Sequence, residues 1–206
     1  MKQYTFLLFF VCTVLIFFVC TVLIFSACSS SDEYRLSGSV FIPDKDFPEL
    51  PKYSEWGYNT FGTYIDRTPF VSDNYTMPVK IIVESDTCRI GFSGQYLNKT
   101  TLTFHLPGFS PENYSALSAL NNKTISLTEP SCMVTFTNNN KTDTLNITEG
   151  LLTFKRVQKL LVDKEEMKSV LSGTFSMKTT IAGEPVTIGN GRFDVTVGEI
   201  NFFKKR

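Results

Sequence analysis

The strongest constraint on the fold is a strict alternation of apolar and polar residues near the C-terminus. In residues 171–181, apolar or small residues take every second position, and Ser, Thr and Lys lie mainly between them. Side chains of a β-strand point alternately to the two faces of a sheet, so this period predicts a strand with one buried face. Residues 182–184 supply a turn, and residues 186–197 alternate again. The two segments predict a long antiparallel hairpin, with a bulge where Gly189-Asn190-Gly191 interrupts its return strand.

Shorter alternating segments recur along most of the chain. They are residues 36–42, 79–84, 88–93, 101–106, 124–128, 132–137 and 145–154. About ten such strands at regular spacing indicate a mainly β, antiparallel β-sandwich or lipocalin-like barrel, and the pattern leaves these two open. Ser110 followed by Pro111 predicts a short helix over residues 111–120, while residues 157–171 fit either a strand or a helical turn. At most one or two short helices are expected in a single domain over residues 36–206.

The N-terminus carries an uncharged apolar run, residues 6–25, in which the octapeptide FFVCTVLI occurs twice. Lys2 precedes the run and the small residues Ser26 and Ala27 follow it, as in a secretory signal peptide. The run also reaches the length that spans a bilayer, so an uncleaved membrane anchor is the alternative. Removing one octapeptide leaves a run of about 12 residues, which is an ordinary signal length. A tandem duplication therefore accounts for the excess.

The stretch Phe25-Ser26-Ala27-Cys28 resembles the lipobox of bacterial lipoproteins. That resemblance implies a signal peptide over residues 1–27, cleavage before Cys28, and attachment of diacylglycerol and palmitate to Cys28. Residues 28–35 would form a polar tether. The SSSDE stretch after Cys28, with SGTFSM at 172–177 and NGRFDV at 190–195, is similar to uncharacterised lipoproteins of gut Bacteroidetes. The family implies attachment to the cell envelope at the outer membrane, with exposure on the cell surface as a further expectation.

Two cysteines and one threonine in the body of the chain suggest covalent modification. Cys88 and Cys132 both fall on the apolar faces of their predicted strands. In an oxidising compartment they could form a disulfide, and two separate core thiols are the other interpretation. Thr144, in the sequence Asp-Thr-Leu, resembles the O-glycosylation signal of Bacteroidetes.

The stretch of residues 47–70 is rich in aromatic residues but lacks periodicity, which predicts a long structured loop. Its rings at Tyr53, Trp56, Tyr58 and Tyr64 are candidates for stacking on a sugar or packing on a partner protein. The alternative is that these rings form a small core for the loop itself or cap the end of a barrel.

Composition narrows the function further. Basic and acidic residues number 20 each, so the chain has no net positive charge that would attract nucleic acid. His105 is the only histidine, and no spacing typical of a metal site or of a serine nucleophile occurs, so no metal, cofactor or catalysis is expected. We expect a binding or structural module whose ligand is a glycan, a lipid or a protein. The alternative is an envelope hydrolase that uses loop carboxylates within residues 49–73, such as Glu49, Glu55, Asp66 and Asp73.

Overall fold

The computed structural model describes residues 38–73, 77–129, 132–162, 165–181 and 183–205. Residues 38–206 belong to one compact unit. The predicted signal peptide, Cys28 and the whole predicted tether over residues 28–35 lie outside the described residues. Among the residues that are described, no helix has the length and apolar character needed to cross a bilayer.

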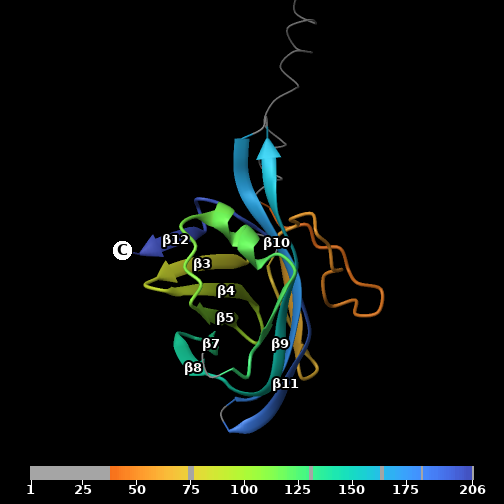
Figure 1. The fold of residues 1–206 in the computed structure, drawn as a ribbon. Helices are drawn as coiled ribbons and strands as arrows, with labels where there is room; N and C mark the ends of the chain where they lie inside the picture. The colour runs from red at the N-terminus through yellow and green to blue at the C-terminus, as the bar shows by residue number, and fades with distance from the viewer. Residues whose placement is uncertain (1–37, 74–76, 130–131, 163–164, 182, 206) are drawn as a thin grey trace, which may run out of the picture. The chain divides into compact units, whose positions relative to one another are not determined.

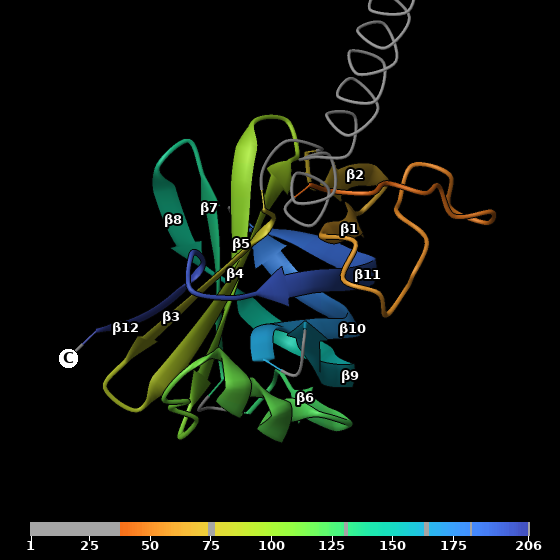
Figure 2. The same cartoon turned by 90° about the horizontal axis from the view of Figure 1, so that it is seen from above.

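The predicted fold class is confirmed: the unit is mainly β, with an antiparallel sheet that curls strongly into a half-barrel (Figures 1 and 2). The strands are β1 (Thr60–Ile65), β2 (Thr68–Val71), β3 (Val79–Glu84), β4 (Thr87–Gln95), β5 (Lys99–Pro107), β6 (Lys123–Ser126), β7 (Met133–Asn138), β8 (Lys141–Thr144), β9 (Asn146–Val162), β10 (Glu165–Ile181), β11 (Glu184–Val197) and β12 (Phe202–Lys205). One short 3₁₀ helix, η1 (Tyr114–Leu120), connects β5 to β6.

The strand order explains the curl of the sheet. Along the main path the order is β6-β9-β10-β11-β1-β2-β4-β5-β7-β8, and all of these neighbours are antiparallel. The connection between β2 and β4 is a single pair, Val71 with Gln95. Most of β4 instead pairs with β3, which carries β12 as a parallel edge strand. The sheet therefore divides at β4, and β9–β11 cross over β3–β5 with the core between them (Figure 2).

Phenylalanine rings fill the space inside the curl. Phe61, Phe92, Phe104, Phe154 and Phe193 are essentially fully buried. The ring of Phe61 stacks on that of Phe92 with centroids 5.0 Å apart. These rings come from both halves of the divided sheet, so one apolar core joins the halves.

The β10–β11 hairpin confirms the strongest prediction, and its glycines explain its packing. Phe193 lies opposite Gly173, and Phe175 lies opposite Gly191. A Cβ on Gly191 would come within 2.6 Å of three ring atoms of Phe175. Each glycine thus leaves room for a ring of the neighbouring strand. The register shifts between Phe175 and Met177, which confirms the irregularity predicted around residues 189–191.

Three local predictions have different outcomes in the structure. Residues 38–42 do not form the predicted strand, and Val40 and Ile42 are 45% and 43% exposed. The segment lies beside the loop at Tyr58, where the N–H of Val40 donates to the carbonyl oxygen of Tyr58. The short helix is confirmed, but Asn113 caps it instead of Ser110. Residues 157–162 belong to β9 and residues 165–171 to β10, and the register of the two strands places Val157 opposite Leu171.

Candidate functional site

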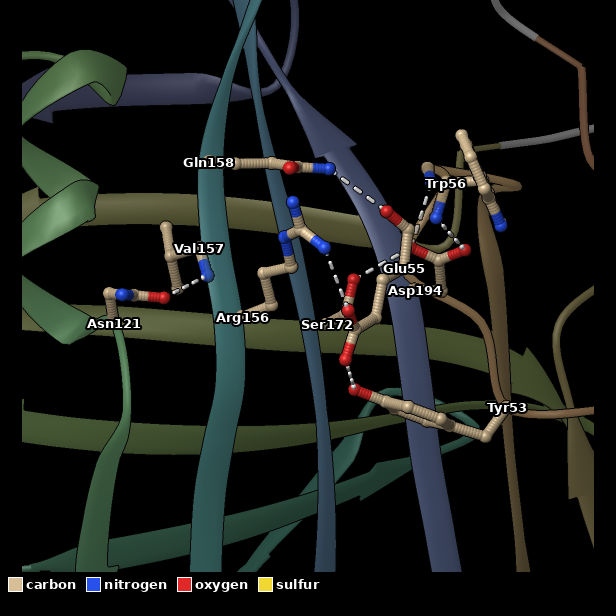
Figure 3. Close-up of polar contacts among 10 residues, drawn as sticks. Tyr53, Glu55, Trp56, Asn121, Arg156, Val157, Gln158, Ser172 and Asp194 are labelled. Carbon is tan, nitrogen blue, oxygen red and sulfur yellow. Dashed lines mark hydrogen bonds and ion pairs between the residues drawn. The ribbon is translucent and has the colours of Figure 1, made fainter.

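Asp194 is a buried aspartate that holds a loop against the outer face of the sheet. Its side chain on β11 is 1% exposed. The carboxylate accepts hydrogen bonds from the backbone N–H groups of Trp56 (3.2 Å), Gly57 (2.8 Å) and Tyr58 (3.1 Å). Ser172 of β10 donates its hydroxyl at 2.8 Å, and Ser54 donates a further one. All five partners are donors, as a carboxylate requires (Figure 3).

These contacts fix the segment that we call the aromatic loop, residues 47–59. The predicted long loop is confirmed over this range, whereas residues 60–65 and 68–70 belong to β1 and β2. Asn59 adds a second attachment, because its Oδ1 accepts both the N–H and the hydroxyl of Thr196. The loop lies on the side of β11 that faces away from β3–β5 (Figures 1 and 2). It therefore covers part of the outer surface of the sheet.

Glu55 ties the loop to β9. Its carboxylate accepts the hydroxyl of Tyr53 at 3.0 Å and Nη1 of Arg156 at 3.2 Å, and its carbonyl accepts Nε2 of Gln158 at 2.9 Å (Figure 3). Burial, together with the hydrogen bond to Glu55, raises the pKa of Tyr53 above its ordinary value. Strands β9, β10 and β11 thus each contribute a polar side chain that orders the loop.

The four aromatic candidates occupy different positions. Trp56 is 78% exposed although its backbone is bound to Asp194, and in Figure 3 that carboxylate lies between Trp56 and Tyr53. Tyr53 and Tyr58 are half-buried in the same loop. Tyr64 lies on β1, where its hydroxyl donates to Glu49 and its ring packs edge-on against Phe47. The structure therefore places three of the four in the aromatic loop, and Trp56 has the most accessible ring of the three.

A groove of about 470 Å³ runs along the outer face of β9, β10 and β11, beside Tyr53. Its lining consists of Tyr53, Leu151, Thr153, Lys155, Thr174, Phe175, Ser176, Asn190, Gly191 and Arg192. A second hollow of about 310 Å³ shares Leu151 and Ser176 with the groove and continues toward Lys178 and Ile188. The side-chain alternation that buries Leu152 and Phe154 points Thr153 and Lys155 into this outer groove.

The predicted loop carboxylates hold structural contacts. Glu49 binds Tyr64, Glu55 binds Tyr53 and Arg156, and Asp66 accepts the N–H of Thr187 at 2.9 Å. Asp66 lies in the turn between β1 and β2, and Asp73 follows β2. Within the described ranges, no cluster of three or more His, Cys, Asp or Glu is placed to hold a metal ion.

Cys88 and Cys132 are free thiols in this structure, which contradicts the predicted disulfide. The strand order gives the reason. Cys88 on β4 lies opposite Leu106 on β5, while Cys132 lies on the other side of β5, with its Sγ 3.6 Å from the carbonyl oxygen of His105. Two strand spacings amount to roughly 9–10 Å, beyond the Cα separation of about 7 Å that a disulfide tolerates. Burial raises the pKa of Cys88 to about 12.

Two remaining residues lie on the other half of the sheet. Thr144 is exposed at the end of β8, where a glycan would have room. His105 is half-buried, with its Nε2 3.3 Å from the hydroxyl of Thr135. Burial and the neighbouring Arg89 keep the pKa of His105 below its ordinary value.

Sequence reasoning missed Asp194, Lys155 and Arg192. The alternation of residues 192–196 did assign Asp194 to the polar face, and this is correct. No signal in the sequence indicated that a loop 140 residues away covers that face. Comparison with family models, curated proteins and solved structures finds no match to this chain, so the site rests on its own geometry.

Proposed function

We propose that this protein is a glycan-binding module of the bacterial cell envelope. The observation that carries the proposal is the ordered aromatic loop beside an open groove whose lining includes several polar side chains: Asp194 fixes the backbone at Trp56, which is 78% exposed, and Tyr53 lines the groove. An exposed ring on an ordered backbone gives a flat apolar face for a sugar, and binding then requires little ordering of the loop.

The chemistry of the groove favours a sugar over a lipid. Hydroxyl and amide side chains dominate its polar lining: Thr153, Thr174, Ser176 and Asn190. Such groups match the hydroxyls of a saccharide. A lipocalin-like site would instead need an apolar cavity inside the barrel, and the rings of Phe61, Phe92 and Phe104 occupy the interior of this sheet.

The cellular location of the protein is part of the same proposal. The lipobox-like Phe25-Ser26-Ala27-Cys28 supports cleavage before Cys28 and lipid attachment there. Residues 38–206 would then be carried on a short tether at the outer membrane. A glycan-binding module in this place would collect polysaccharide at the envelope.

Trp56 is the only tryptophan, so its emission reports on the proposed site alone. We expect the purified full-length protein in detergent to change its emission with at least one polysaccharide from a panel of neutral and acidic types. In affinity gel electrophoresis, Trp56→Ala should weaken retention by that polysaccharide roughly tenfold, the loss of about 1.4 kcal/mol of stacking.

Phe203→Ala is the matched control, because Phe203 is a 42% exposed ring on β12 and not on the aromatic loop. It should bind like the wild type. Lack of retention by every polysaccharide of the panel would refute a glycan-binding function.

A further inference from the structure

The groove beside the aromatic loop is positively charged. Lys155 and Arg192 are its two charged lining residues, and the described lining contains no Asp or Glu. The rest of the lining is hydroxyl, amide, aromatic or apolar. A neutral sugar needs no basic side chain in its binding site. The two basic residues are therefore not explained by glycan binding alone.

The two cations differ in how they are compensated. Arg192 is largely buried and is paired with Asp44, with 2.7 Å between Nη1 and Oδ2, and its Nε donates to the carbonyl of Asn190. Lys155 is exposed, and its Nζ lies 4.8 Å from the centroid of the Tyr53 ring. None of the described carboxylates forms an ion pair with Lys155. The Lys155 ammonium therefore lies over an aromatic face in the groove lining and has no anionic partner among the described residues.

The other end of the groove is electrically balanced. In the adjoining hollow, Nζ of Lys178 lies 2.9 Å from Oε2 of Glu149. The hollow and the groove share Leu151 and Ser176, so they form one continuous depression along the strands. This depression has a positive end near Tyr53 and a neutral end near Lys178, which suits an elongated ligand.

We propose that the depression binds a linear acidic glycan, with a uronate carboxylate at the Lys155 ammonium and further sugar units extending toward Lys178. The inference rests on the proposed glycan-binding function and specifies its ligand class. The hydroxyls of Thr153, Thr174 and Ser176 line the depression and face the sugar units.

Polygalacturonate and its fully methyl-esterified form are suitable probes, since they share one backbone and differ in charge. We expect the full-length protein to bind polygalacturonate at least about tenfold more tightly, with a preference that shrinks as sodium chloride rises above roughly 0.1 M. Lys155→Gln should reduce the preference to about twofold or less, and Lys155→Arg should retain most of it.

Lys99→Gln is the control for net charge, because Lys99 is exposed on β5 and does not line the depression. It should leave the preference unchanged. Equal binding of the charged and esterified polymers would overturn the acidic specificity and leave the proposed function intact. Binding of neutral polysaccharides alone would also overturn the acidic specificity and leave the proposed function intact. A preference for the charged polymer that survives Lys155→Gln would do the same. If no polysaccharide binds, the proposed function fails, and this inference fails with it.

Discussion

At the scale of single residues, the contacts of Asp194 fix the aromatic loop to the outer face of the sheet. The alternation of residues 192–196 placed this side chain correctly on the outer face. What the sequence could not predict was its burial, because three of its partners are backbone N–H groups at residues 56–58. Any residue except proline supplies such a group, so these contacts have no signature in the side-chain sequence.

Asp194→Asn should both destabilise the protein and loosen the aromatic loop. The amide presents a donor where the carboxylate accepts hydrogen bonds, and two to three of the five would be lost or opposed. We expect the free energy of unfolding to fall by about 2–4 kcal/mol in urea denaturation. The fluorescence anisotropy of Trp56 should also decrease.

Asp143→Asn is the appropriate comparison, since Asp143 forms an exposed ion pair with Lys141 at 3.3 Å. Its cost should stay below about 1 kcal/mol, as for most surface pairs. Equal stability of the two variants would contradict the role that we assign to Asp194.

At the scale of elements, the positions of individual strands were easier to predict than which strands pair with each other. The hairpin over residues 171–197 followed from long alternating segments on both sides of a turn, with one predicted bulge. Residues 157–171 were ambiguous because Leu161 and Met167 are 57% and 51% exposed and break the pattern. The disulfide prediction failed for a different reason. Cys88 lies on β4 as expected and Cys132 directly precedes β7, but β5 separates them, and strand order depends on long-range pairing. Alternation carries no information about that order.

Gly94 on β4 lies where the sheet divides. A Cβ at this position would overlap the carbonyl oxygen of Val71, next to the single pair that joins β2 to β4. Gly94→Ala should therefore separate the two strands and lower the free energy of unfolding by about 1–3 kcal/mol. Chemical denaturation would measure the loss.

Gly189→Ala tests whether the effect is steric. This glycine also lies on a strand, but an added Cβ would meet only Thr187 Cγ2, at 4.0 Å. The substitution should change stability by less than about 1 kcal/mol. If Gly94→Ala were as mild as Gly189→Ala, the junction would not depend on the close approach of β2 and β4.

At the scale of the whole molecule, the sequence predicted an antiparallel β domain but left sandwich and barrel open. The half-barrel lies between these two, because the sheet divides at β4 instead of closing or splitting completely. A junction of one residue pair leaves no periodic signal. The same holds for the groove, whose lining comes from three strands and a loop that are distant in sequence.

The proposed envelope anchor is also a property of the whole chain. Mature protein from the membrane fraction should begin at Cys28 and carry the mass of acyl groups, since several chains are needed for stable attachment. Cys28→Ala should move the protein out of the membrane fraction or leave it unprocessed. A native protein that retains residues 1–27 without added lipid would contradict the anchor.

The Phe–Gly pairs of β10 and β11 have a consequence for how these strands find each other. The strands are 17 and 14 residues long, and sliding one past the other by two residues would keep every apolar side chain on the inner face. Such a slip would set Phe175 against Phe193, or leave Gly173 facing Gly191 with an empty space between them. Only one alignment gives each ring a glycine, so the two glycines act as alignment marks that distinguish the native hairpin from its slipped forms.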